Sequence, residues 1–314
     1  MKIAFVVDPL HSFRIYKDST YAMLVEANTR GHELYVMRQE DLVWKRNKVV
    51  GVARQVTLRN HPKDWYFLDP AIEMPLTQFD AVVMRKDPPF DMEYVTSTWL
   101  LEIAVGQGAR VFNDPRAIRD FSEKLAIARF AQFTAPTLVT RLAIQIDAFI
   151  DEHHDVILKP LDGMGGMSIF RVREDDPNRN VIIETLTNMG TRSIMAQRYI
   201  PEIAEGDKRI LVIGGQPVPY CLARIPKAGE SRGNLAAGGT GVCRPLSDRD
   251  REIAETLAPE LISRGLLLVG LDVIGEYLTE VNVTSPTCFR EITDQSGFNV
   301  AAMFMDALEA ASGA

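Results

Sequence analysis

The sequence predicts an α/β protein that begins with a doubly wound domain, in which helices cover both faces of a mostly parallel sheet. Residues 3–7 form a continuous apolar run, as a buried parallel strand does. Two further expected strands, at 33–37 and 80–84, alternate with helical patterns at 18–31 and 94–104. This alternation up to about residue 120 is typical of a parallel sheet. The chain of 314 residues is long enough for two or three domains.

The elements of this first domain have recognisable ends. The first strand stops at Asp8-Pro9, and Asp18-Ser19-Thr20 offers a cap for a helix that ends at Gly31. In doubly wound sheets, ligands bind beyond the carboxyl ends of the strands. Lys17, Asp18 and Ser19 follow the first strand, and Arg85 to Pro89 follow the strand at 80–84. We therefore expect these two segments to form one wall of a site.

Two further units follow. In the second, Ser122 is expected to cap a helix with Lys124 in its first turn, and strands at 156–159 and 168–172 flank a glycine-rich turn. The third contains strands and a closing helix, at 210–213, 218–224, 267–274, 278–283 and 297–311. We expect domains at 1–121, 122–200 and 201–314, with a glycine-rich loop at 226–242 in the third.

Charge, cysteine spacing and the length of the apolar runs exclude several classes of function. The 35 basic and 42 acidic residues give a net charge of −7, which argues against a nucleic-acid binder and favours small-molecule chemistry. The three cysteines show no C-x-x-C spacing, so neither a disulfide framework nor a zinc knuckle is indicated. No apolar run approaches the roughly 18 residues of a membrane span, and the first apolar run is too short for a signal peptide. We expect a cytoplasmic protein without a membrane partner.

The strongest local signal is a lysine followed by glycines. Lys159 ends an apolar strand and precedes Gly163, Gly165 and Gly166. Glycines let the backbone approach a ligand closely, and successive amides in such turns bind anions. A nearby lysine adds a charge suited to phosphate. A plain glycine-rich hairpin is the alternative, although an unpaired buried ammonium group is costly.

A second signal lies in two strands around Gly275-Glu276-Tyr277. A turn at these three residues places Asp272 opposite Glu280, and Asn282 shares the face of Glu280. Opposed like charges destabilise a hairpin unless something compensates them. Three side-chain oxygens on one face suit a hard cation such as Mg²⁺. A solvated polar face is the alternative.

The third signal is the loop at 226–242, which contains Lys227, Arg232 and five glycines and follows Arg224. A lid over a reactive intermediate needs hinges and often a positive charge near phosphates. A flexible connector has the same composition, so both interpretations stay open.

Several blocks together resemble the ATP-grasp ligases, and among them the bacterial glutathione synthetases. They are MRKDPPF at 84–90, ILKPLDGMGG at 157–166, GDKR at 206–209, PYCLARIP at 219–226, GNLAAGG at 233–239 and TEVNVTSPT at 279–287. The lysine-glycine and Glu-x-Asn elements are shared widely among ATP-grasp enzymes. The first, fifth and sixth blocks are more specific, and the resemblance covers nearly the whole chain.

The resemblance implies an ATP-grasp fold behind an N-terminal Rossmann-like domain, and it implies a role for each matching residue. The ATP-binding residues would be Lys124, Lys159, Gly163, Gly165, Gly166, Gln197, Arg198, Tyr199, Ile200 and Asp207. The remaining roles would be catalysis by Arg209, Arg224 and Arg232, metal binding by Asp272, Glu280 and Asn282, and substrate binding by Lys17, Asp18, Ser19, Arg85, Ser285 and Thr287. One departure is Thr240, where similar sequences often carry a basic residue in the lid.

The implied reaction joins γ-glutamylcysteine and glycine to glutathione at the expense of ATP, through an acyl phosphate, with Mg²⁺ or Mn²⁺. Water destroys an acyl phosphate, so this chemistry favours the lid interpretation of 226–242. Two other functions stay open: a D-alanine–D-alanine or glutamate-adding type of ligase, and a non-catalytic nucleotide-binding protein. Family analogy also suggests a homo-oligomer, either a dimer or a tetramer.

Overall fold

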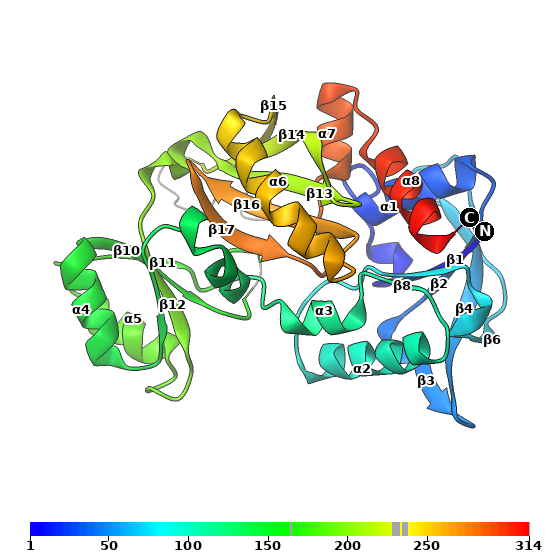
Figure 1. Cartoon of the computed structure of the whole chain (residues 1–314), viewed down its shortest axis with the longest axis horizontal. Helices are drawn as coiled ribbons and strands as arrows, with labels where there is room; N and C mark the ends of the chain where they lie inside the picture. Colours follow the sequence, from blue (N-terminus) through cyan, green and yellow to red (C-terminus); the bar gives the residue numbers. More distant parts are fainter. Residues whose placement is uncertain (164, 228–232, 234–237, 314) are drawn as a thin grey trace.

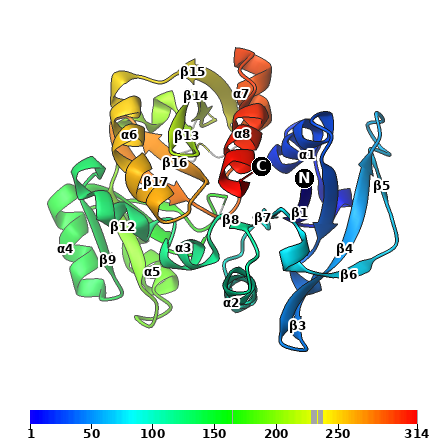
Figure 2. The ribbon, with the colours of Figure 1, turned by 45° about the vertical axis from the view of Figure 1, so that its right-hand side comes forward.

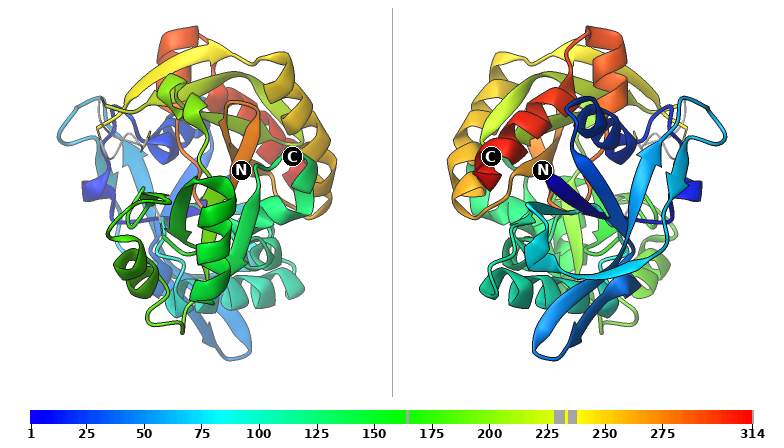
Figure 3. Two further views of the ribbon diagram at one scale, coloured as in Figure 1. Left: turned by 90° about the vertical axis from the view of Figure 1, so that its left-hand side faces the viewer. Right: turned by 90° about the vertical axis from the view of Figure 1, so that its right-hand side faces the viewer.

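The computed structural model describes residues 1–163, 165–227, 233 and 238–313 (Figure 1). Its strands form three sheets, one for each third of the chain. The first and second sheets lie at opposite ends of the molecule, and the third lies between them (Figures 1 and 3). Short 3₁₀ turns connect the elements at Leu10–Ser12, Gln39–Asp41, Leu76–Gln78 and Pro201–Glu205.

The first sheet has the predicted parallel centre. Its strands β2 (Glu33–Met37), β1 (Lys2–Val6), β7 (Ala81–Met84) and β8 (Val111–Phe112) are parallel neighbours in that order. An antiparallel extension that the sequence analysis did not predict joins β2 through β4. It consists of β3 (Leu42–Lys45), β4 (Lys48–Leu58), β5 (Tyr66–Leu68) and β6 (Ile72–Pro75).

Helices cover both faces of this sheet, as the doubly wound prediction requires. Helix α1 (Ser19–Thr29) starts at Asp18, whose carboxylate accepts a hydrogen bond from the Tyr21 amide at 2.7 Å. Ile3 and Phe5 pack in the core that contains α1, whereas Ala4 and Val6 pack with α2 (Met92–Gly106). The short helix α3 (Pro115–Asp120) follows on the α2 side.

The second sheet has the order β11-β10-β12-β9, and its core lies under helices α4 (Ala143–His153) and α5 (Arg179–Leu186). Its strands are β9 (Thr137–Thr140), β10 (Asp155–Pro160), β11 (Phe170–Arg173) and β12 (Ile194–Arg198).

The predicted cap at Ser122 is wrong. Lys124 is the cap residue of a 3₁₀ helix, η4 (Leu125–Phe133). The reason is a long-range contact: the Glu123 carbonyl accepts a hydrogen bond from the Val281 amide at 2.8 Å. Glu123 is therefore tied to the third sheet, and residues 122 and 123 lie outside the helix.

The third sheet is antiparallel, with the order β15-β14-β13-β16-β17, and α6 (Asp248–Ser263) packs on it. Its strands are β13 (Asp207–Ile213), β14 (Gln216–Ile225), β15 (Thr240–Pro245), β16 (Leu268–Ile274) and β17 (Tyr277–Asn282). The last helices, α7 (Phe289–Ser296) and α8 (Val300–Ser312), return to the first domain. Helix α8 lies beside α1, and one apolar core joins the first and third sheets (Figure 2).

The predicted loop at 226–242 is shorter than expected at its end. Residues 240–242 begin strand β15, where Thr240 pairs with Ile225. Thr240 therefore lies at the base of the loop, because backbone pairing extends the sheet to this residue. Arg232 lies outside the described residues. Among the described helices, none is long and apolar enough to cross a membrane.

Candidate active site

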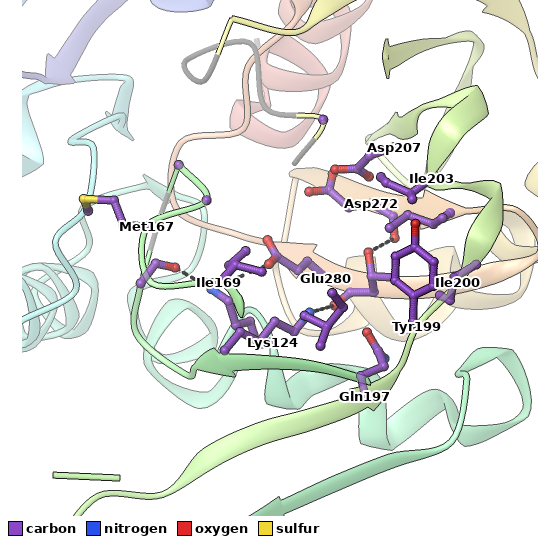
Figure 4. Close-up of a pocket in the computed structure, with 18 of the residues that line it drawn as sticks. Lys124, Met167, Ile169, Gln197, Tyr199, Ile200, Ile203, Asp207, Asp272 and Glu280 are labelled. Carbon is purple, nitrogen blue, oxygen red and sulfur yellow. Dashed lines mark hydrogen bonds and ion pairs between the residues drawn. The ribbon is translucent and has the colours of Figure 1, made fainter. Parts of the chain in front are cut away.

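A first cavity lies between the second and third sheets (Figure 4). It contains about 830 Å³ of empty space, part of which is open to solvent. Strands β10 and β12 form one wall, and β13, β16 and β17 form the other. All residues that the sequence analysis selected for ATP line this cavity: Lys124, Lys159, Gly163, Gly165, Gly166, Gln197, Arg198, Tyr199, Ile200 and Asp207.

Two lysines give the cavity its positive charge. Lys159 lies at the end of β10 with 5% of its surface exposed, and its Nζ is 3.5 Å from the Thr279 carbonyl oxygen. Burial lowers the pKa of Lys159, and Glu280 opposes this effect. Lys124 donates to the Gly163 carbonyl and lies 3.6 Å from the Glu280 carboxylate. The two lysines thus bring two ammonium groups to the same end of the cavity, where they could bind an anion such as phosphate.

The segment from Gln197 to Ile200 forms the apolar end of the cavity. The Gln197 side chain donates to Thr137 at 3.0 Å, and the Arg198 guanidinium donates to the Tyr277 hydroxyl at 3.1 Å. These two side chains are therefore used to hold neighbouring strands. Ile200 is buried and presents an apolar surface beside the Tyr199 ring (Figure 4). A flat apolar ring system suits this wall.

Asp207 opens strand β13 and carries an unused acceptor. Its Oδ2 accepts a hydrogen bond from Arg224 at 2.5 Å, whereas its buried Oδ1 has no hydrogen-bond partner among the residues that the structure describes. Burial raises the pKa of Asp207 to about 6, against the opposing effect of Arg224. A buried acceptor without a donor is costly, so a ligand hydroxyl at this position would stabilise the site.

The pairing of Asp272 with Glu280 is confirmed, but the predicted three-residue turn is wrong. Ile274 pairs with Tyr277, so Gly275 and Glu276 alone form the turn. An irregularity at Thr279 shifts the register by one residue and brings Asp272 opposite Glu280. Such a bulge cannot be read from strand periodicity, because the extra residue changes the pairing only locally.

The like charges of this pair are compensated by cations. Asp272 accepts from Arg209 through both carboxylate oxygens, at 2.5 and 3.1 Å, and from Arg224 at 2.9 Å. The two arginines hold the pKa of Asp272 well below its usual range, despite burial. Gly270 makes this arrangement possible, since a Cβ there would lie 3.0 Å from the Arg209 Cδ.

The residues selected for a metal have the donors that Mg²⁺ prefers. Asn282 lies opposite Gly270 and donates its Nδ2 to the Gly270 carbonyl at 3.1 Å, which leaves its Oδ1 as an acceptor. Three arginine contacts use three of the four lone-pair positions of Asp272, so one position on Oδ1 remains. In the described part of the chain, no group of three or more His, Cys, Asp or Glu side chains could hold a metal. Two carboxylates and one amide, with substrate oxygens completing the shell, still fit Mg²⁺.

A second cavity adjoins the first and shares Gly165 with it. It opens between the first and third sheets and contains about 1350 Å³ of empty space, including open solvent. All residues selected for the second substrate line it: Lys17, Asp18, Ser19, Arg85, Ser285 and Thr287. Arg209, Arg224 and Asn282 also line it, so the ion cluster at Asp272 lies where the two cavities meet.

Arg85 has two kinds of contact in this cavity. Its Nε donates to Thr20 at 3.1 Å and its Nη2 donates to the Pro286 carbonyl at 2.9 Å, which ties α1 to the loop after β17. Its Nη1 is buried and has no hydrogen-bond partner in the described part of the chain. The arginine therefore holds two segments together and keeps one donor nitrogen for a ligand.

Sequence reasoning missed two residues that hold the site in shape. The Glu123 carboxylate accepts hydrogen bonds from the Val283 and Thr284 amides and the Thr284 hydroxyl. The Asn113 side chain bonds Leu268 and Val283, which joins β8 to the third sheet. Their partners lie more than 150 residues away in sequence, so no local pattern could have identified them.

Comparisons with known proteins identify the family of the chain. Residues 1–119 match the family model of the prokaryotic glutathione synthetase N-terminal domain, and residues 123–297 match the model of its ATP-grasp domain. A relative named glutathione synthetase, from Ralstonia nicotianae, is 65% identical over 313 residues, which is 100% of this chain and 97% of the relative.

Solved structures share the fold at low identity. The crystal structure of the D-cycloserine synthetase DcsG has a TM-score of 0.69 at 15% identity, with 99% of each chain covered. The ATP-grasp ligase PsnB, complexed with a minimal precursor, Mg and ADP, has a TM-score of 0.64 at 18% identity, with 99% of this chain and 98% of that chain covered. The chain belongs to the family of prokaryotic glutathione synthetases.

Proposed function

We propose that this chain joins γ-glutamylcysteine and glycine to glutathione, with conversion of ATP to ADP and phosphate. The family and the 65% identity over the whole chain support this assignment. The observation that carries it structurally is the meeting of two cavities at the ion cluster of Arg209, Arg224 and Asp272. A nucleotide in one cavity and a peptide in the other would bring phosphate and carboxylate together there.

The first cavity would hold ATP. Lys124 and Lys159 would bind its phosphates, with the turn at Gly163, Gly165 and Gly166 beside them. The adenine would lie against the segment from Gln197 to Ile200. The unpartnered Oδ1 of Asp207 would accept a hydrogen bond from a ribose hydroxyl.

Asp272, Glu280 and Asn282 would hold a divalent metal, for which Mg²⁺ is the proposed ion and Mn²⁺ a substitute. The PsnB ligase, which shares the fold, was solved with Mg and ADP. A bound Mg²⁺ would supply positive charge to the phosphate oxygens of ATP.

Arg209 and Arg224 would orient the reacting groups. Both are buried and both face the second cavity while Asp272 holds them in place. Fixed positive charges stabilise the charge that develops as the cysteinyl carboxylate of γ-glutamylcysteine attacks the terminal phosphate. The glycine amine would then attack the acyl phosphate, with release of phosphate.

The acyl phosphate must be kept from water. We assign this task to the loop between β14 and β15, which starts at Pro226 and contains Arg232 and Gly233. Gly233 lines the first cavity, so at least one described residue of the loop reaches the proposed nucleotide site.

The peptide substrate would lie in the second cavity, against Lys17, Asp18, Ser19, Arg85, Ser285 and Thr287. The free Nη1 of Arg85 would bind a carboxylate of the substrate. The domain boundaries at 121 and 200, a homo-oligomeric state and a cytoplasmic location, where ATP is available, are also proposals.

An amine panel tests the function. Purified protein is incubated with ATP, Mg²⁺, γ-glutamylcysteine and one of glycine, D-alanine or glutamate, and both ADP and peptide products are measured. We expect glutathione, one per ADP, with glycine as the preferred amine. Product with D-alanine or glutamate but none with glycine would favour another ligase, and absence of ADP with every amine would contradict ligase activity.

A further inference from the structure

The second cavity contains a carboxylate, that of Glu291, which has no part in the proposed binding of ATP, metal or peptide. Glu291 lies in the first turn of α7 and lines this cavity. Its Oε2 is buried and has no hydrogen-bond partner among the described residues. A buried acceptor without a donor destabilises the unliganded protein, and a ligand that donates a hydrogen bond to it removes this cost.

The other carboxylates of the cavity are already engaged. Asp18 caps α1 through the Tyr21 amide, and Asp87 accepts from the Ser285 hydroxyl at 2.6 Å. Glu123 accepts the hydrogen bonds from Val283 and Thr284. Each of these three carboxylates is engaged through one oxygen. Among the described residues that line this cavity, Glu291 is the carboxylate with a buried oxygen that lacks a hydrogen-bond partner, so it is the candidate for a cationic group of a ligand.

We infer that Glu291 binds the α-ammonium group of the glutamyl end of γ-glutamylcysteine and makes the enzyme specific for a peptide that carries it. This inference rests on the proposed function. Lys17, whose charge acts on Glu291, and Arg85, with its free Nη1, line the same cavity and supply cations for the neighbouring α-carboxylate.

The chemistry excludes the other amine in the reaction. Glycine must attack as a free amine, because an ammonium group has no lone pair. A carboxylate beside that amine would stabilise its protonated form and oppose the attack. The ammonium group of γ-glutamylcysteine takes no part in the bond changes, so a carboxylate can hold it through the whole reaction.

Burial supports the same assignment. Desolvation raises the pKa of Glu291, which shows that the empty cavity does not fully compensate its charge. A charge-assisted hydrogen bond between this carboxylate and an ammonium group is worth about 1.5–3 kcal/mol. By the tenfold change per 1.4 kcal/mol, that corresponds to a roughly 10- to 100-fold effect on kcat/KM.

The test compares γ-glutamylcysteine with N-glutarylcysteine, which has hydrogen in place of the ammonium group. We expect wild-type protein to prefer γ-glutamylcysteine by roughly 10- to 100-fold in kcat/KM. In Glu291→Gln, kcat/KM for γ-glutamylcysteine should fall by that factor while the value for N-glutarylcysteine changes little, so the preference should shrink to about threefold or less. The KM values for ATP and glycine should stay within about twofold of wild type.

Asp294→Asn is the matched control, because it removes one negative charge from the same helix at a side chain that is 56% exposed. It should keep the wild-type preference. Glu291→Asp retains the charge and should keep a preference of at least about threefold, and it also serves if Glu291→Gln fails to fold.

A wild-type preference in Glu291→Gln, or a loss of preference in Asp294→Asn as large as in Glu291→Gln, would overturn the inference while leaving the ligase function intact. A rise in the KM for glycine alone would also overturn it, by assigning Glu291 to the wrong amine. If wild-type protein makes no glutathione, the proposed function itself fails, and the inference falls with it.

Discussion

Replacement of Glu280 by glutamine separates the proposed metal-binding role of the β16–β17 hairpin from its structural role. The Glu280 side chain is 22% exposed, and its ion pair with Lys124 spans 3.6 Å. Because Lys124 is buried, loss of this charge should cost some stability, but less than the roughly 3–5 kcal/mol of a fully buried ion pair that is broken. The variant should therefore fold, with a smaller loss of melting temperature than Asp272→Asn.

Its turnover should fall sharply, because glutamine has no negative charge to offer a divalent ion. Loss of groups that merely support a metal ligand costs roughly 10- to 100-fold in affinity or activity, so loss of a proposed ligand should cost at least tenfold at limiting Mg²⁺. Asp272→Asn provides the contrast. It leaves Arg209 buried without its carboxylate and Arg224 with Asp207 alone, which should destabilise the fold by roughly 3–5 kcal/mol.

The assay measures ADP release across a Mg²⁺ titration together with thermal melting of both variants. We expect Glu280→Gln to need more Mg²⁺ and to melt closer to wild type than Asp272→Asn, which should melt several degrees lower. Full activity of Glu280→Gln at limiting Mg²⁺ would refute the metal assignment. An unchanged melting temperature of Asp272→Asn would refute the account of the ion cluster.

Three further predictions concern other parts of the site. Arg85→Lys should raise the KM for γ-glutamylcysteine at least roughly tenfold and leave the KM for ATP unchanged. Equal changes in both constants, with a lower melting temperature, would show that Arg85 only holds Thr20 and Pro286 together and does not bind the substrate. Replacing residues 227–239 by a short glycine linker should increase the amount of ATP hydrolysed per peptide formed, because water would reach the acyl phosphate. If this ratio and the turnover both stay unchanged, the loop only connects β14 to β15. Because burial raises the pKa of Asp207 to about 6, the folded chain keeps this proton to higher pH than the unfolded chain. The free energy of unfolding of wild type relative to Asp207→Asn should therefore fall from about pH 4 to pH 6 and then level off; a rise over this range would contradict the burial argument.

Local patterns in the sequence were sufficient where one strand or one helix decides the structure. The strand predicted at 33–37 coincides with β2. The helix after Asp18 starts and ends as predicted, because its cap and Gly31 are local signals. The opposition of Asp272 and Glu280 was also predicted, although by a turn that differs from the real one.

Contacts between distant segments could not be predicted in this way. Arg209 and Asp272 are 63 residues apart, and nothing near Asp272 indicates that two arginines compensate it. The same holds for Ser122, whose expected cap was displaced when Glu123 bonded to β17 and the loop after it. The antiparallel extension from β3 to β6 was missed because it does not follow a strand-helix alternation. The two-residue turn between β3 and β4 is Arg46-Asn47, which has positive φ angles but lacks the glycine that usually marks such a hairpin.

ADP release with γ-glutamylcysteine, measured with and without glycine, tests the central claim most directly. The two-cavity arrangement predicts that peptide, ATP and Mg²⁺ alone give little steady ADP release, and that glycine raises it and yields one glutathione per ADP. ADP release that glycine does not change, with no glutathione formed, would contradict the assignment of this chain as a glutathione-forming ligase.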